Sequence, residues 1–250
     1  MFTKTEGIVI RTSDYGETNK VVTLFTRDLG KIAVMARGAK KPKSRLASLT
    51  QLFTYGSFLV QKGSGMGSMQ QGELIQSFRS LREDIFKTAY AAYIVELTDK
   101  LTEDKQPNPF LFELLYQTLI YMHEGIDLDI LMYIYEVKMF EVAGIPPYLN
   151  GCANCGRTEG TFAFSVREGG LLCNQCFNVD PYRMQVSQPA LKLLRLFFYF
   201  DIKKLGTVSV KQQTKDELKK MITAYNEAHS GVFLKSRRFL EQLSHFENES

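Results

Sequence analysis

The sequence lacks any long apolar run of the kind that crosses a membrane. Its most hydrophobic stretch, 191–200, is interrupted by Lys192 and Arg195, whereas a spanning helix needs about 20 mostly apolar residues. The first residues alternate polar with apolar side chains and lack the apolar core of a secretory signal. We therefore expect a cytoplasmic protein without a membrane segment.

The motifs of common enzymes that act on nucleic acids are also missing. There is no G-x-x-x-x-G-K-[ST] phosphate loop, no His-x-Glu motif ahead of a cysteine pair as in zinc deaminases, and no dense carboxylate cluster for a two-metal nuclease. The glycine-rich stretch 63–67 leads into a strand pattern without a suitably placed lysine, which favours a flexible hairpin over a nucleotide site. These absences predict a protein that is not an enzyme.

Cysteine is scarce, and its four residues form two close pairs. Cys152 and Cys155 make one C-x2-C motif, and Cys173 and Cys176 make a second after seventeen intervening residues. This spacing fits a four-thiolate zinc site, and a reducing cytoplasm disfavours structural disulfides. Segments 161–166 and 169–172 predict a short hairpin that joins the pairs. We expect one structural Zn2+, because four thiolates leave no open position for catalysis.

Positive charge is concentrated near the N-terminus. Residues 1–80 carry 12 Lys and Arg against 5 Asp and Glu, residues 81–150 carry 5 against 12, and residues 151–250 carry 14 against 10. The densest basic segment is 37–45, with the cations Arg37, Lys40, Lys41, Lys43 and Arg45. Many such runs are solvated loops, but a basic loop beside a small barrel favours phosphate binding.

A second basic group lies near the C-terminus and consists of Lys235, Arg237 and Arg238. Its pattern is less specific than that of segment 37–45. It predicts either an extension of a DNA-binding track or the solvated side of a final helix.

The first 80 residues have the pattern of a small β-barrel. Short segments rich in β-branched residues predict strands at 5–12, 20–26, 31–36, 52–61 and 69–78. Five strands without a long helix between them favour an OB-fold, with an SH3-like barrel as the alternative. For Phe53, Tyr55 and Phe58, core packing is favoured over base stacking.

From residue 80 the apolar period becomes helical. It predicts a helix from 80 to about 101, and further helices at 110–124, 130–142, 189–200 and 214–229. Ser80 with Glu83, and Thr214 with Glu217, have capping-box spacing. The fold class is α+β and multidomain: an OB-fold domain at 1–79, a helical domain at 80–149 and 179–250 forming one bundle, and a zinc finger inserted at 150–178.

Together these motifs resemble the RecO family of bacterial recombination mediators over essentially the full length. The resemblance is carried by 6–10, 37–45, 144–147, the two C-x2-C pairs and 234–238. It implies a DNA repair and recombination factor that binds single- and double-stranded DNA. It also implies ATP-independent annealing of strands, including those coated by single-stranded DNA-binding protein (SSB), loading of RecA together with RecR, and a functional link to RecF.

Two other classes of function stay open at this point. A zinc-ribbon adaptor that binds only protein would show no DNA binding at low salt. A zinc-dependent nucleic-acid enzyme would show hydrolysis that depends on the metal.

Overall fold

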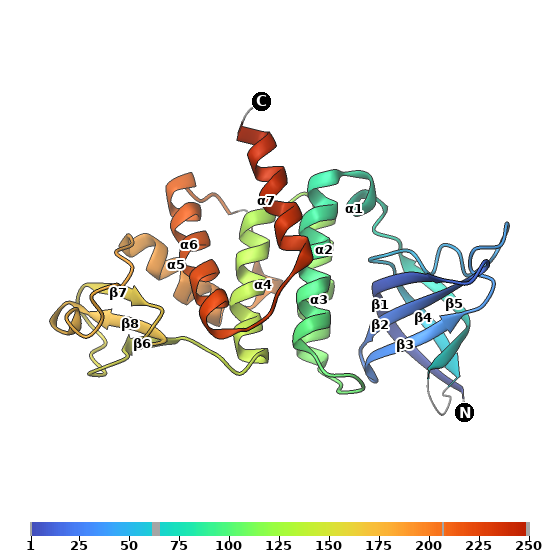
Figure 1. Ribbon diagram of the computed structural model, residues 1–250, viewed down its shortest axis with the longest axis horizontal. Coiled ribbons are helices and arrows are strands. Elements are labelled where there is room, and N and C mark those ends of the chain that lie inside the picture. Colours follow the sequence, from blue (N-terminus) through green and yellow to red (C-terminus); the bar gives the residue numbers. More distant parts are fainter. Residues whose placement is uncertain (1, 62–65, 207, 249–250) are drawn as a thin grey trace. The chain divides into compact units, whose positions relative to one another are not determined.

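A computed structural model describes residues 2–61, 66–206 and 208–248 of the chain. They form two compact units, one made of 1–126 with 234–250 and one made of 127–233. The first unit holds the barrel and helices α1, α2, α3 and α7, and the second holds α4, α5, α6 and the cysteine region (Figure 1). The domain boundaries drawn from the sequence stay a prediction.

Five strands close the N-terminal barrel, and the OB-fold expectation is confirmed. They are β1 (Phe2–Tyr15), β2 (Asn19–Thr26), β3 (Gly30–Ala36), β4 (Tyr55–Gln61) and β5 (Gly67–Gln76), in the closed order β1-β2-β3-β5-β4. Among the described residues of the barrel, β3 and β5 form the one parallel pair, and the other pairs are antiparallel. The glycine-rich stretch interpreted as a flexible hairpin lies mostly outside the described residues, which resume at Met66.

Alternation along the strands fills the barrel with apolar side chains. Val9, Leu24, Val34 and Phe58 are buried in one cluster, as period-two patterning requires for residues on one face of a strand. The β2–β3 hairpin turns at Gly30, whose φ of 66° lies in the left-handed region. A Cβ there would lie 2.4 Å from the Gln106 carbonyl oxygen. Both the backbone conformation and the close contact therefore require glycine at this position.

The helices of the first unit are α1 (Arg79–Glu83), α2 (Ile85–Leu101), α3 (Pro109–Glu124) and α7 (Lys235–Asn248). The predicted capping box of Ser80 and Glu83 is wrong, because both residues lie within the short helix α1. The long helix α2 instead begins after Asp84, whose carboxylate accepts from two backbone N–H groups. Aspartate at this position satisfies donors that the first helical turn leaves unpaired.

The barrel is fastened to its helices by aromatic and charged side chains. The Arg27 guanidinium lies 4.6 Å from the centre of the Phe112 ring and pairs with Glu6 and Glu113. Tyr55 packs on Phe112 of α3 and donates to the Glu6 carboxylate. The barrel therefore has a fixed position on α3.

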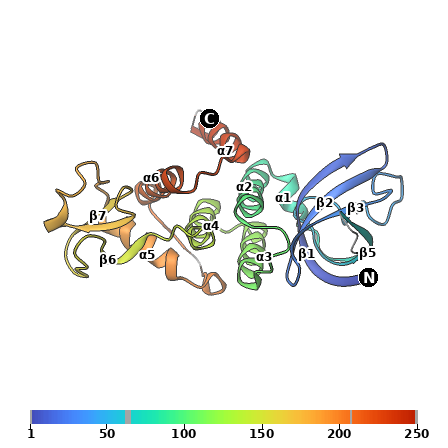
Figure 2. The same ribbon diagram turned by 60° about the horizontal axis from the view of Figure 1, so that its bottom comes forward.

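The second unit combines helices α4 (Leu128–Val142), α5 (Gln188–Tyr199) and α6 (Gln212–His229) with a small sheet. Its strands are β6 (Tyr148–Cys152), β7 (Phe162–Ser165) and β8 (Gly170–Cys173), followed by the single turns η1 (Asn174–Cys176) and η2 (Ile202–Lys204). The antiparallel pairing of β7 with β8 confirms the hairpin expected between the cysteine pairs. Figure 2 shows the same elements from a second direction.

The predicted capping box of Thr214 and Glu217 is also wrong. Helix α6 begins at Gln212, two residues earlier, and Lys211 makes no side-chain cap. Glu217 instead accepts hydrogen bonds from the backbone N–H and the hydroxyl of Ser187, the residue that caps α5. No helix in the described part of the chain is both long and apolar enough to span a bilayer.

Candidate metal centre and nucleic-acid interface

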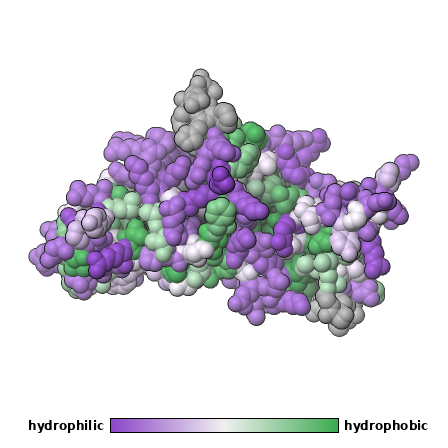
Figure 3. Space-filling model, in the orientation of Figure 1, coloured by the Kyte–Doolittle hydropathy of each residue, from purple (hydrophilic) through white to green (hydrophobic). Residues whose placement is uncertain are grey.

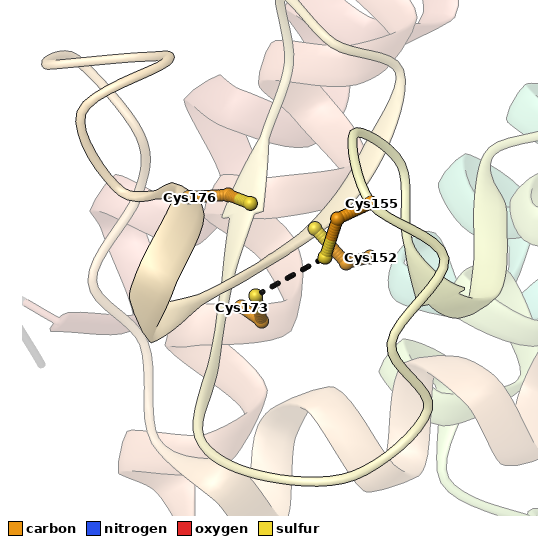
Figure 4. Close-up of side chains that lie close together, drawn as sticks. All are labelled: Cys152, Cys155, Cys173 and Cys176. Carbon is orange, nitrogen blue, oxygen red and sulfur yellow. Dashed lines mark hydrogen bonds between the residues drawn. The ribbon is translucent and has the colours of Figure 1, made fainter.

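The four cysteines converge on one point in the second unit. All four Sγ atoms lie within 4.8 Å of one another, and those of Cys155 and Cys173 are 3.6 Å apart (Figure 4). A tetrahedron of thiolates around zinc, with arms of about 2.3 Å, has edges of about 3.8 Å. The cluster could therefore bind a metal ion with little movement.

Local backbone turns hold each pair in place. After β6, the Gly156 N–H bonds to the Cys152 carbonyl, and Gly156 has a φ of 75°. In the second pair, Cys173 is the last residue of β8 and Cys176 is the last residue of η1, the turn that follows directly. Cys152, Cys173 and Cys176 are buried, whereas Cys155 is exposed.

The ionisation of the thiols fits a cation at their centre. Burial raises the pKa of Cys152, but hydrogen bonds from backbone groups of Cys173, Cys155 and Asn154 outweigh it and lower that pKa to about 6. For Cys176, a hydrogen bond from Asn154 lowers the pKa, but burial and the neighbouring sulfurs raise it to about 11. A cation among the sulfurs would favour the thiolate form that metal binding requires.

The basic segment 37–45 begins the connection between β3 and β4, and backbone bonds anchor it to the β1–β2 turn. The Gly38 N–H donates to the Asn19 side chain at 2.9 Å, and the Lys40 N–H donates to the Thr18 carbonyl at 2.9 Å. Gly38 and Lys43 both have left-handed φ angles, 67° and 62°. The end of the barrel that carries these two loops is mainly hydrophilic (Figure 3).

All five cations of the segment are exposed, but one of them is already paired. The Lys40 ammonium lies 2.6 Å from Asp14, and its hydrogen bond holds the pKa of that carboxyl below the ordinary value despite some desolvation. Within the described part of the chain, no carboxylate is within ion-pair distance of the other four, which are Arg37, Lys41, Lys43 and Arg45. Their charges are therefore available to an anion.

A groove beside Arg37 contains residues that the sequence did not single out. It is lined by Tyr15 and Asn19 around the β1–β2 turn, Met35 of β3, and Met66. Tyr15 is 58% exposed. The strand 2–3 face and the loop after strand 1 are where OB-folds bind oligonucleotides, and an exposed ring there offers a stacking surface. The sequence feature that could have identified this residue is its place: Tyr15 is an aromatic residue next to Gly16, at the end of the first strand.

The three aromatic residues considered for stacking belong to the core. Phe53 and Phe58 are fully buried, and Tyr55 is 6% exposed. The preference for core packing is thus confirmed.

The C-terminal basic group lies on another element. Lys235, Arg237 and Arg238 occupy the first turn of α7, which packs against α2. In both views this turn is well separated from the β3–β4 connection. Arg237 pairs with Glu241 one turn later, whereas Lys235 and Arg238 are exposed. The structure therefore does not join the two basic groups into one patch.

Comparison with known proteins gives consistent matches along the chain. The family model described as recombination protein O N terminal matches residues 1–78, and that described as recombination protein O C terminal matches residues 82–238. The DNA repair protein RecO of Bacillus cereus (strain B4264) is 59% identical over 247 residues, which cover 99% of this chain and all of the relative. The DNA repair proteins RecO of Bacillus cytotoxicus and Bacillus anthracis (strain CDC 684 / NRRL 3495) are 59% and 58% identical over the same length.

Proposed function

The chain belongs to the RecO family of DNA repair proteins, and on this premise we propose that it binds DNA through its barrel and pairs complementary single strands without ATP. The observation that carries the proposal is the anchored β3–β4 connection, whose exposed, unpaired cations adjoin a groove with an exposed tyrosine. Cations on a fixed loop neutralise phosphates, and the ring stacks on bases without selecting among them.

Charge neutralisation explains how such a surface would accelerate annealing. Two polyanionic strands repel each other, so their encounter is slow until cations reduce the repulsion. No step of this process consumes a nucleotide, in keeping with a sequence that has no phosphate loop. The protein is in this proposal not an enzyme, and it works in the cytoplasm on the nucleoid.

The finer parts of the proposal come from family resemblance. They are annealing of strands coated by SSB, loading of RecA together with RecR, and cooperation with RecF. The exposed cations of α7, Lys235 and Arg238, are a secondary DNA contact together with Arg237.

We assign a structural Zn2+ to Cys152, Cys155, Cys173 and Cys176. Zinc bound by four thiolates supplies folding energy and cross-links β6 to the turn after β8. The four sulfurs leave no position for a water molecule, so the metal has no catalytic part.

The proposal is tested by a fluorescence-quenching assay of annealing between complementary oligonucleotides, bare or coated with SSB, with and without ATP. We expect acceleration in both cases and no effect of ATP. Changing Lys40, Lys41 and Lys43 together to Glu should remove the acceleration. The matched control changes three exposed lysines of α6 and its N-cap, namely Lys211, Lys219 and Lys220, to Glu.

Two results would contradict the proposal. Annealing no faster than the uncatalysed reaction, or annealing that needs ATP, would exclude strand pairing as its function. If DNA binding were also absent at low salt, a protein-binding adaptor would be the better description.

A further inference from the structure

The barrel carries a second groove, at the opposite end of the basic segment from the groove beside Arg37. It is formed by β1, β4 and β5 together with Arg45 and the residues that follow it. Among the described residues, the two grooves have no lining residue in common. Arg37 thus lies in the first groove and Arg45 in the second.

Strand register explains why the second groove is polar and open. Lys4 of β1 is paired with Leu59 of β4, which is paired in turn with Gln71 of β5. Directly paired residues project from the same face of a sheet. In the neighbouring row, Phe58 points into the barrel core. The row of Lys4, Leu59 and Gln71 must therefore face outward, because successive side chains of a strand alternate between faces.

The lining suits a single strand of nucleic acid. Lys4 and Arg45 are exposed and have no ion pair with any described residue. Glu73 is the one carboxylate in the lining, so the two cations leave an excess of positive charge. Gln71 supplies an amide that both donates and accepts. Leu59 and Leu46, which are partly exposed, give a small apolar surface against which bases can rest, whereas Leu49 is buried in the barrel core.

We propose that this second groove binds the second DNA strand during annealing, so that one barrel holds two strands on either side of the basic segment. The inference rests on the proposed function, since it assumes that the groove beside Arg37 takes the first strand. Lys41 and Lys43 then lie between two polyanions, where their charge lowers the repulsion between the strands.

The stoichiometry of oligonucleotide binding tests the proposal without any substitution. The probe is a fluorescent oligonucleotide of about 8 nucleotides, within the range of about 4 to 16 that one OB-fold covers. It is titrated at low salt into protein at a concentration well above the dissociation constant. We expect two oligonucleotides bound per chain.

A double variant then tests whether Lys4 and Arg45 form the second oligonucleotide-binding site. Lys4→Gln with Arg45→Gln removes two exposed charges, and Lys219→Gln with Lys220→Gln on α6 is the charge-matched control. We expect the first variant to bind one oligonucleotide per chain and to lose acceleration of annealing between longer strands. The control should bind two and anneal as the parent does.

Each outcome separates this inference from the proposed function. One oligonucleotide per parental chain, or a Lys4 and Arg45 variant that still binds two and anneals at the parental rate, would overturn the second groove and leave DNA binding intact. No binding by the parent would overturn both. An acidic peptide that binds the parent but not the variant, together with a single oligonucleotide per chain, would reassign the groove to a protein partner.

Discussion

At the scale of single residues, helix ends in this protein are completed by carboxylates from distant parts of the chain. Glu96 on α2 accepts from the backbone N–H groups of Lys235 and Ser236 and from the Ser236 hydroxyl. Burial raises the pKa of Glu96, but these bonds outweigh it and lower the pKa. One acidic side chain therefore both caps α7 and attaches it to α2.

We predict that Glu96→Gln loosens α7 without unfolding the barrel. An amide offers one acceptor oxygen in place of two, so the attachment should weaken by about 1 kcal/mol, as for loss of a helix cap. Hydrogen exchange of the α7 amides should become faster, whereas Glu103→Gln, at an exposed site, should leave it unchanged.

The same interaction should depend on pH. The folded-state pKa of Glu96 is lowered, so its contribution is present above the ordinary pKa of glutamate and is lost as the pH falls through the lowered value. In the parent, the protection of the α7 amides from hydrogen exchange should decline over that acidic range. Equal protection in parent and Glu96→Gln at neutral pH would contradict this role.

Lys31 is the most enclosed cation of the barrel. It is 9% exposed, and its ammonium donates to the carbonyls of Asp99 and Thr102 at the end of α2. It also lies 3.2 Å from the Asp99 carboxylate. The ammonium thus completes the C-terminus of α2, where cations are favoured.

We predict that Lys31→Met destabilises the first unit by about 3 kcal/mol, because a partly buried carboxylate and two carbonyls lose their partner. Urea unfolding followed by circular dichroism measures the change. Lys41→Met, which removes an exposed and unpaired lysine, is the control. Similar midpoints for both variants would show that the Lys31 contacts contribute little.

At the scale of elements, the cysteine module consists of very short strands. Strands β7 and β8 have 4 residues each, and β6 has 5. Small modules of this kind commonly depend on a metal, whose binding energy is also folding energy. The four sulfurs that converge from two turns are the groups that could hold such a metal.

We predict one zinc per chain in protein purified without added metal. Cys173→Ser, at a fully buried ligand, should lose the zinc and lower the melting temperature of the second unit by more than about 10 °C. Elemental analysis and calorimetry measure the two effects, with Ser209→Ala as an exposed control. Metal-free parental protein with the same melting temperature would contradict a structural zinc.

At the scale of the whole molecule, the densest run of exposed cations, segment 37–45, lies on the barrel. The acidic middle of the sequence contributes its carboxylates to caps and attachments such as Asp84, Glu96 and Asp99. These three carboxylates therefore bind groups within the protein, whereas the cations of segment 37–45 are exposed on the barrel.

We predict that DNA binding is strongly dependent on salt and weakly dependent on sequence. If all five cations of segment 37–45 contact phosphates of single-stranded DNA, the log–log slope is about −3.5, which is roughly a hundredfold loss of affinity between about 50 and 200 mM salt. Fluorescence anisotropy across salt concentrations measures the slope. Affinity that does not change with salt would exclude the basic segment as the main contact.

The sequence by itself determined the barrel strands, most helices, the cysteine cluster and the basic loop. Each of these follows from a local pattern: alternation along a strand, the helical period, the C-x2-C spacing and a run of cations. Such patterns act over a few residues and need no knowledge of what lies opposite.

Only the tertiary structure decided which groups meet across the chain. Thr214 and Glu217 have the spacing of a cap, yet Glu217 bonds to Ser187, thirty residues earlier. Tyr15 adjoins Arg37, and Lys4 shares a face with Gln71, because strand register and the closure of the barrel bring them together. The physical reason is that hydrogen bonds and charge pairs are satisfied by whichever partner is near in space, and nearness is set by packing of the whole barrel and its helices.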